Sequence, residues 1–309
     1  MRFVYNYFLD QSKKNGHKKA YDMCKDLKEL QEEYEWLKEV DSCSLRCAIF
    51  NLEDAYRNFF EERNYYPVFK NKYIHQSYRT NCIRSSYKGK NYSNIEIDLK
   101  NKKIKLPKLG QVDIRGYRSL ESISDRIINA TITKEINGKY YVSVIVEESE
   151  IIKNKVEEKS IVGLDLGVKD LIITSNGEKY DNKKILSKYE KRLKRLQRKL
   201  SRQEKGSKNY QKAKLKIGRL HSKIKNNRKH YMNDTINKIV LENDIIVTEK
   251  LDVKRMSHKS HFAKSILDAS FGSICEILKW KCRRYGKYYY QVDTYYPSSK
   301  ICSKCGEKT

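Results

Sequence analysis

Apolar side chains in the first 60 residues recur every three or four positions, which is the spacing of one face of an α-helix. The first series is Met23, Leu27, Leu30, Tyr34 and Leu37, and the second is Leu45, Ile49, Leu52, Tyr56 and Phe59. Because such apolar faces become buried by packing against each other, we expect two amphipathic helices in contact. Residues 1–66 are therefore predicted to form a helical unit.

From Tyr66-Pro67 to about Glu150 the apolar spacing changes to two, which is typical of strands with one buried face. The clearest alternation covers residues 128–133 and 140–146, on either side of Asn137-Gly138. Asn-Gly between two such segments is a strong signal for a tight hairpin turn. The sequence therefore predicts a β-rich domain over residues 67–158.

Two short apolar segments, residues 160–174 and 245–248, predict strands of a second sheet, with some seventy residues inserted between them. The insertion carries one stripe of Leu186, Tyr189, Leu193, Leu196 and Leu200 and another of Ala213, Ile217, Leu220 and Ile224. Lys205-Gly206-Ser207 separates the stripes, so residues 183–242 are predicted to form a helical hairpin. A later helix presents Leu267, Phe271, Ile274, Leu278, Cys282 and Tyr285 on one face and ends at Gly286, before a strand at 288–292.

An aspartate lies inside the first of these apolar strands, in Ile161-Val162-Gly163-Leu164-Asp165-Leu166-Gly167. An ionised carboxylate is costly to bury without a partner, and Mg²⁺ prefers one or two carboxylates together with phosphates. The alternative is a turn aspartate beside two glycines. Asp165 is therefore a candidate metal ligand.

Glu249 ends the strand at 245–248 and could share a cation with Asp165 if the two strands are neighbours. Two acids in that arrangement match the requirement of two-metal phosphodiester cleavage. The alternative is a solvated acid that opens the loop 250–252. The remaining acids near these strands are interpreted as turn or strand-end residues, namely Asp170, Asp244, Asp252 and Asp293.

The net charge of +27 is unevenly distributed, with 27 Lys/Arg against 22 Asp/Glu in residues 1–150 and 39 against 17 in residues 151–309. Residues 183–230 contain 20 Lys/Arg and only Glu190 and Glu204 as acids. Such dense cations repel one another unless an anion is near, which favours nucleic-acid phosphates over a merely solvated face. The cations we expect to contact phosphates are Lys191, Arg195, Arg198, Lys199, Arg202, Lys212, Lys216 and Arg219.

No apolar run approaches the length of a membrane span, and the N-terminus lacks the pattern of a secretory signal, so we expect a cytoplasmic protein without a membrane partner. Six of the eight cysteines lack ligand spacing and are predicted to be small apolar core residues. Cys302-x-x-Cys305-Gly306 has the spacing of one zinc knuckle. Two thiolates form only half of a tetrahedral site, so we expect weak or no Zn²⁺ binding.

Together these segments resemble the transposon-encoded TnpB (OrfB) family, compact RNA-guided nucleases related to type V CRISPR effectors. The resemblance runs through nearly the whole chain. It is carried by residues 2–6 (RFVYN), 36–41 (WLKEVD), 76–80 (QSYRT), 106–110 (LPKLG), 163–167 (GLDLG), 263–266 (AKSI), 268–270 (DAS) and 297–300 (PSSK), followed by Cys302 and Cys305. The combination is specific, although each motif alone is weak.

The resemblance implies an α+β multidomain protein in which a barrel-like, wedge-like β domain follows the helical unit. It further implies a RuvC-like nuclease domain of RNase H fold over residues 159–309, with the basic hairpin at 183–242 and part of a zinc ribbon at 297–309. Asp165 and Glu249 match the first catalytic aspartate and the catalytic glutamate as Mg²⁺ ligands, and the complete site would hold two Mg²⁺ ions. The implied partners are a guide RNA from the transposon end and double-stranded DNA with a short adjacent motif, whose readers would include Tyr21, Arg46, Tyr78 and Arg79.

Relatives usually begin with an earlier β strand and continue into a second cysteine pair and a third RuvC aspartate. We therefore expect weak or absent cleavage by this chain. Two alternatives to the RNA-guided DNA endonuclease remain open, namely a catalytically incomplete relative that only binds RNA or DNA, and a strand-transfer transposase that shares RNase H chemistry.

Overall fold

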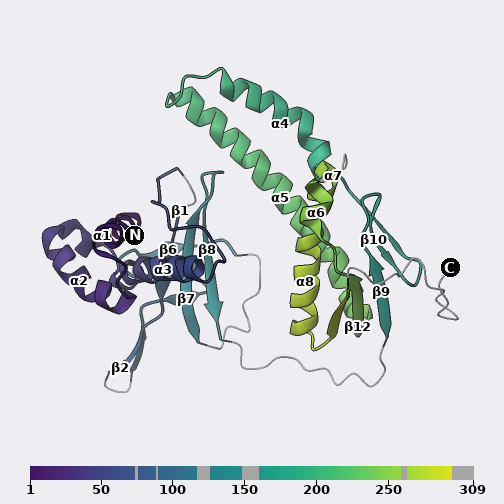
Figure 1. Cartoon of the computed structure of the whole chain (residues 1–309). Helices are drawn as coiled ribbons and strands as arrows, with labels where there is room; N and C mark the ends of the chain where they lie inside the picture. Colours follow the sequence, from purple (N-terminus) through teal and green to yellow (C-terminus); the bar gives the residue numbers. More distant parts are fainter. Residues whose placement is uncertain (74–75, 88–89, 117–125, 148–159, 259–262, 294–309) are drawn as a thin grey trace. The chain divides into compact units, whose positions relative to one another are not determined.

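The computed structural model describes residues 1–73, 76–87, 90–116, 126–147, 160–258 and 263–293 (Figure 1). The chain divides into two compact units, Met1–Ser149 and Glu150–Thr309. Helices and strands occur in both units, which confirms the mixed α and β composition expected from the sequence. Cys302 and Cys305, the expected half zinc site, lie outside the described residues.

Three α-helices begin the N-terminal unit: α1 (Arg2–Asn15), α2 (Ala20–Glu33) and α3 (Ser42–Phe60), with the 3₁₀ turn η1 (Glu35–Glu39) between the last two. Their apolar faces form one core, in which Leu45 and Ile49 are fully buried. Helix α3 begins after Asp41, whose carboxylate accepts hydrogen bonds from two amides of the first turn. The expected helical packing is therefore confirmed, although α2 ends before Leu37, which is buried in η1 instead.

The strands of the N-terminal unit form three small antiparallel sheets. β1 (Gln76–Asn81) pairs with β7 (Ile127–Lys134), which pairs with β8 (Tyr140–Val146) across the predicted Asn137-Gly138 hairpin. β2 (Arg84–Tyr87) pairs with β3 (Lys90–Ser93), and β4 (Glu96–Asp98), β5 (Lys103–Leu106) and β6 (Gly110–Asp113) form the third sheet. A barrel requires every strand to have two neighbours. The described strands leave open edges in each sheet, so the expected barrel-like closure is wrong for this part of the chain.

A five-stranded mixed sheet forms the centre of the C-terminal unit, in the order β11-β10-β9-β12-β13. Its strands are β9 (Ile161–Asp165), β10 (Asp170–Thr174), β11 (Lys179–Asp181), β12 (Ile245–Glu249) and β13 (Tyr288–Val292). β9, β10 and β11 are antiparallel neighbours, whereas β12 is parallel to both β9 and β13. The strands predicted at 160–174, 245–248 and 288–292 are therefore confirmed as members of one sheet.

The insertion between β11 and β12 is a pair of long helices, α4 (Ile185–Ser201) and α5 (Lys208–Glu242), which run side by side as a hairpin (Figure 1). Gly206 has a positive φ of 93° in the connection, and the Ser207 side chain caps α5. The leucine stripe predicted on α4 is half-buried, and Leu220 and Ile224 of α5 are buried. The expected helical hairpin is therefore confirmed.

Two short helices, α6 (Val253–His258) and α7 (Ala263–Ala269), precede α8 (Phe271–Arg284). The single helix predicted across Leu267 is interrupted at Ser270, which takes the left-handed conformation with φ 55°. The interruption turns Leu267 away from the core, so its side chain is 61% exposed. The part of the predicted apolar face that lies on α8 is confirmed, because Phe271, Ile274 and Leu278 are fully or almost fully buried.

One face of the five-stranded sheet carries the core of the C-terminal unit. Val162 and Leu164 of β9 and Ile246 of β12 pack in one cluster with apolar residues of α5 and α8. These side chains occupy alternate positions of their strands, so the intervening residues face the other side of the sheet.

Among the described helices, none is long and apolar enough to cross a lipid bilayer.

The turn from β9 to β10 depends on Gly167. A Cβ atom at this position would lie 2.7 Å from the Asp170 carbonyl oxygen, whereas a Cβ atom at Gly163 would meet Ser175 Cβ at an ordinary 3.7 Å. The first approach cannot be relieved by rotating a side chain, because the obstructing atom belongs to the backbone. Gly167 therefore allows the chain to reverse directly after Asp165.

We expect Gly167→Ala to lower the free energy of unfolding by about 1–3 kcal/mol, because the added methyl group displaces backbone. Gly163→Ala is the matched control and should change the free energy of unfolding by less than about 0.5 kcal/mol. Unfolding in guanidinium is monitored through the fluorescence of Trp280. The variants carry Trp36→Phe, since the chain has only these two tryptophans. Equal destabilisation by both substitutions would contradict the role given to Gly167.

Candidate active site and nucleic-acid interface

Strands β9 and β12 are aligned by a cluster of hydrogen bonds just before both strands begin. The Ser160 amide donates to Asp244 Oδ2 at 3.2 Å, and the Asp244 amide donates to Ser160 Oγ at 3.1 Å. The amides of Asp244 and Ile245 also donate to the Ser160 carbonyl oxygen, each at 3.0 Å. These reciprocal bonds fix the register, in which Val162 lies beside Ile246 and Leu164 beside Thr248.

Asp165 and Glu249 each follow directly after the last pair of this register. Neighbouring strands are about 4.8 Å apart, and residues aligned in a parallel pair project to the same face. Val162, Leu164, Ile246 and Thr248 are all buried on the helix-covered face, whereas Asp165 and Glu249 are exposed. The structure therefore brings the two predicted acids together at the same end of adjacent central strands.

The chemistry of this pair suits a hard divalent cation. Mg²⁺ takes oxygen ligands and is commonly held by one or two carboxylates, with waters and substrate phosphates completing the octahedron. Among the described residues, no group of three or more His, Cys, Asp or Glu side chains is arranged to hold a metal. Asp165 and Glu249 are therefore the two described residues that could hold Mg²⁺ here, and its other oxygen ligands would come from elsewhere.

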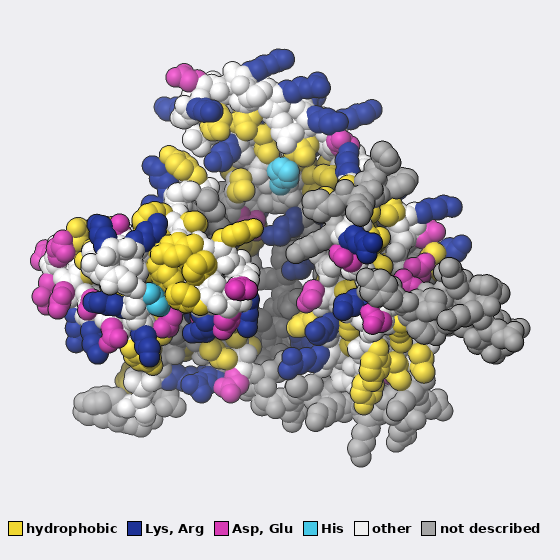
Figure 2. Space-filling view, viewed as in Figure 1, with side chains coloured by type: hydrophobic (Ala, Val, Ile, Leu, Met, Phe, Trp, Pro, Cys, Tyr) yellow, Lys and Arg dark blue, Asp and Glu magenta, His cyan; other side chains and the backbone are white. Residues whose placement is uncertain are grey.

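The exposed side of α4 carries many cations, and Figure 2 shows several lysine and arginine side chains over the hairpin. A shallow hollow along α4 is lined by Lys191, Lys194, Arg195, Arg198, Lys199, Arg202 and Gln203. From Lys191 to Arg202 the helix rises about 16 Å, a span that can follow several successive phosphates. Five of the predicted phosphate-contacting residues thus share one surface.

Lys194 belongs to the same hollow and was missed from the sequence. Its Nζ lies 2.9 Å from Glu190 Oε1, and Lys264 forms a second ion pair with the same carboxylate. The lysine side chains hold the pKa of Glu190 at about 2, through hydrogen bonds from Lys264 and Lys194. Lys194 follows Lys191 by three positions and precedes Arg198 by four, and this helical spacing could have placed it on the same surface. The other predicted cations of the hairpin, Lys212, Lys216 and Arg219, are exposed on α5.

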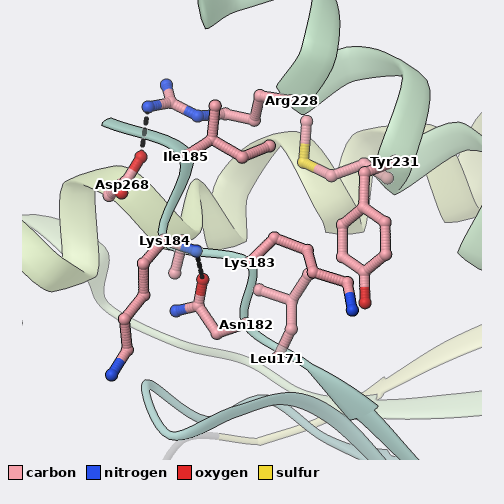
Figure 3. A pocket seen from close by; sticks show the side chains of 10 residues that line it. Leu171, Asn182, Lys183, Lys184, Ile185, Arg228, Tyr231 and Asp268 are labelled. Atoms are coloured by element: carbon pink, nitrogen blue, oxygen red, sulfur yellow. Dashed lines mark hydrogen bonds and ion pairs between the residues drawn. The ribbon is translucent and has the colours of Figure 1, made fainter. Parts of the chain in front are cut away.

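The base of the hairpin is fixed by Asp268, the last but one residue of α7 (Figure 3). Its side chain is 6% exposed, and Oδ2 accepts a hydrogen bond from the Leu186 amide in the first turn of α4 at 3.1 Å. Arg228 of α5 forms an ion pair with the same carboxylate. One acid therefore caps α4, which has no cap of its own, and neutralises a cation of α5.

The predicted readers in the N-terminal unit are distributed over α2, α3 and β1. Tyr21 is 77% exposed and Arg46 is exposed on α3, whereas Tyr78 and Arg79 are half-buried in β1. Burial, together with the negative charge of Asp41, raises the pKa of Tyr78. The Thr80 hydroxyl donates to Asp41 Oδ2 at 2.6 Å, so the cap of α3 also ties that helix to β1.

Comparisons with known proteins place these elements in a family. Residues 141–260 match the family described as "Probable transposase" (OrfB of the IS605 type), and residues 271–309 match a "Cas12f1-like, TNB domain". A Streptomyces pristinaespiralis protein named "Putative RNA-guided DNA endonuclease" is 31% identical over 276 residues, covering 89% of this chain. A protein of the same description from Escherichia coli (strain K12) is 33% identical over 289 residues, again covering 89% of this chain.

The chain spans 65% and 68% of the lengths of these two relatives. A solved structure of a Cas12f1–sgRNA–target DNA complex is similar over 100% of this chain and 74% of that protein, with a TM-score of 0.57 and 15% identity. At this identity the likeness concerns the fold. The fold of the chain is thus similar to that of Cas12f1.

We expect Asp268→Ala to lower the free energy of unfolding by about 2–4 kcal/mol, because it leaves the guanidinium of Arg228 without its partner and α4 without its cap. Asp268→Asn should cost less, since the amide oxygen can still cap α4. The double variant Arg228→Met, Asp268→Leu should be closer to the parent than Asp268→Ala is. The free energy of unfolding of all three variants is measured through Trp280 fluorescence in the Trp36→Phe background. An unchanged free energy of unfolding in Asp268→Ala would contradict the structural role given to Asp268.

Proposed function

This chain belongs to the TnpB/OrfB family of transposon-encoded proteins, and on that premise we propose that it acts as an RNA-guided DNA endonuclease. The observation that carries the proposal is the alignment of Asp165 and Glu249 on adjacent parallel strands, on the sheet face away from the core. The names of the two relatives describe the same activity. A mixed sheet with its acids on the central strands also supports the RuvC-like RNase H fold that the sequence resemblance implies.

In the proposed reaction, Asp165 and Glu249 hold Mg²⁺ through their carboxylate oxygens at the end of β9 and β12. When bound there, Mg²⁺ would supply Lewis-acid activation of water and charge stabilisation of the leaving oxygen in phosphodiester hydrolysis. The rigid pairing of the two strands keeps both oxygens on one side of the sheet, so the ligands are in position before nucleic acid binds.

The basic hairpin is proposed to hold the guide RNA or its duplex with target DNA. Its cations contact phosphates, which carry no base identity, so recognition of the target sequence is left to base pairing. In the N-terminal unit, Tyr21, Arg46, Tyr78 and Arg79 remain proposed readers of a short motif beside the target. The Cys302 and Cys305 thiols are proposed as two ligands of a Zn²⁺ site.

Cleavage of target DNA in the presence of guide RNA and Mg²⁺ should be lost with Asp165→Ala and with Glu249→Gln. Each substitution removes an ionised ligand, so we expect a rate decrease of at least about 100-fold, while guide-dependent DNA binding remains. Asp181→Asn is the matched control, because Asp181 is an exposed acid of β11, two strands away from β9. Its rate should equal that of the parent.

The same assay separates the alternatives. Guide-dependent binding without cleavage by the parent would indicate a binding protein, and joined rather than cut ends would indicate a strand-transfer transposase. Cleavage that persists in both Asp165→Ala and Glu249→Gln would refute the proposed site.

Replacing Lys191, Arg195, Arg198 and Arg202 with Glu should weaken RNA binding and flatten its salt dependence. Affinity falls with salt, and each phosphate contact on a single strand adds about 0.7 to the steepness of log affinity against log salt. Loss of four contacts should therefore make the slope less steep by about 3. Fluorescence anisotropy with labelled RNA at several salt concentrations measures the slope.

A charge-matched variant controls for the change in net charge. It replaces four exposed lysines of the N-terminal unit with Glu, namely Lys100, Lys102, Lys108 and Lys139. Its slope should stay within about 1 of the parent value. Equal slopes for the two variants would mean that the exposed side of α4 is not the phosphate-binding surface.

A further inference from the structure

Residues 61–73 follow α3 without forming a helix or strand, and together with Phe60 at the end of α3 they expose large apolar side chains. Tyr65 is 95% exposed, Phe60 64% and Phe69 47%, and Tyr66 is also exposed. Hydrophobic side chains gather on the visible face of this unit with lysines and arginines around them (Figure 2). Clusters of this kind on a protein surface mark binding sites more often than chance. We call Phe60, Tyr65, Tyr66 and Phe69 the aromatic surface.

The aromatic surface is held in place by specific contacts. The Tyr66 hydroxyl lies 3.0 Å from the Tyr56 hydroxyl, and its ring packs edge-on against Tyr56 with the centroids 5.6 Å apart. The Asn6 side chain of α1 both accepts from the Lys70 amide at 2.8 Å and donates to the Lys70 carbonyl oxygen at 2.9 Å. Because the segment is tied to α1 and α3, its exposed rings are presented in a fixed arrangement.

Cations lie between and beside these rings. Lys13 Nζ is 4.3 Å from the centre of the Phe69 ring and 5.8 Å from that of Tyr66. Lys72 Nζ is 5.3 Å from the centre of the Tyr73 ring. Glu61, an acid of the same segment, forms an ion pair with Arg63. The surface therefore combines flat π faces with positive charge at the spacing of cation–π contacts.

We propose that the aromatic surface binds unpaired bases of single-stranded RNA, with the neighbouring lysines contacting its phosphates. Every base has a π face, so stacking on exposed aromatic rings tolerates any sequence, and the cations match the charge of the backbone. A second copy of this chain fits less well, since a two-fold interface would bring the same lysines together. The inference rests on the proposed function only in taking RNA as a partner.

The test measures binding of a fluorescein-labelled oligouridine by the full chain carrying Asp165→Ala, without guide RNA or Mg²⁺. Under these conditions the result is independent of cleavage, so a failure of the nuclease proposal leaves it readable. Tyr65→Ala with Phe69→Ala should weaken oligouridine binding about 5- to 100-fold, the loss expected for one or two stacked bases. The slope of log affinity against log salt should remain unchanged, because no cation is removed.

The matched control is Ile136→Ala with Tyr140→Ala, two residues of the same unit that are 71% and 67% exposed. It should bind oligouridine as the parent does. Tyr65→Phe with Phe69→Tyr keeps both rings and should also retain affinity. Lys13→Gln should lower the salt slope by about 0.7. Binding of double-stranded RNA, whose bases are already stacked, should be unchanged in the Tyr65→Ala, Phe69→Ala variant.

Parent-like oligouridine binding by the Tyr65→Ala, Phe69→Ala variant would overturn the proposal. So would a loss confined to oligodeoxythymidine, which would assign the surface to DNA. Sedimentation velocity covers the remaining possibility: a dimer that dissociates in this variant, with unchanged RNA affinity, would make the surface a contact between two copies of the chain.

Discussion

The register between β9 and β12 is the constraint on which the candidate active site depends. Side chains alternate across a sheet, so a shift of one residue would move Asp165 or Glu249 to the opposite face. It would also place a carboxylate among Val162, Leu164 and Ile246, where an unpaired charge is costly. The reciprocal hydrogen bonds between Ser160 and Asp244 fix this register from the other end of the strands. Hydrophobic burial and polar pairing thus select the same alignment.

The long helix α5 allows a large basic insertion to coexist with that sheet. Its C-terminal half packs Ile236, Ile239 and Val240 into the sheet core, whereas its N-terminal half packs Leu220 and Ile224 against α4. A single helix therefore belongs to the sheet core at one end and to the cationic hairpin at the other. Asp268 joins both helices to α7 near the middle of this span, so the cations are carried on a rigid support.

Local sequence patterns predicted much of this arrangement because they report what a short segment buries. The apolar segment around Asp165, the heptad-like stripes of the hairpin and the Asn137-Gly138 turn all depend on neighbours in sequence. Leu267 was misassigned because its periodicity continues through Ser270, and only the left-handed backbone there breaks the helix. Asp268 could not be foreseen, since its partner Leu186 is 82 residues away.

The two candidate metal ligands, Asp165 and Glu249, illustrate the same distinction. The apolar strand around Asp165 suggested a buried acid, but the structure exposes it on the face opposite the core. The expectation that Asp165 and Glu249 end neighbouring strands was nevertheless correct, because it depended on strand pairing rather than on burial. A shared cation stays a prediction. The barrel-like expectation came from the family resemblance and failed for the described strands. Local alternation could not have corrected it, since it does not encode strand pairing over long separations.

Under the proposed function, the distribution of charge implies that the two halves of the chain would contact nucleic acid by different physical means. Residues 151–309 have a net charge of +22 from 39 cations and 17 acids, whereas residues 1–150 have +5 from 27 cations and 22 acids. A charge of +22 supplies affinity that falls steeply with salt and is blind to base identity. The half with the smaller charge would rely more on contacts that salt screens weakly, such as the proposed stacking on the aromatic surface, whose segment is held by Asn6 and Tyr56. Discrimination between paired and unpaired nucleic acid is therefore expected to come from the half with less charge.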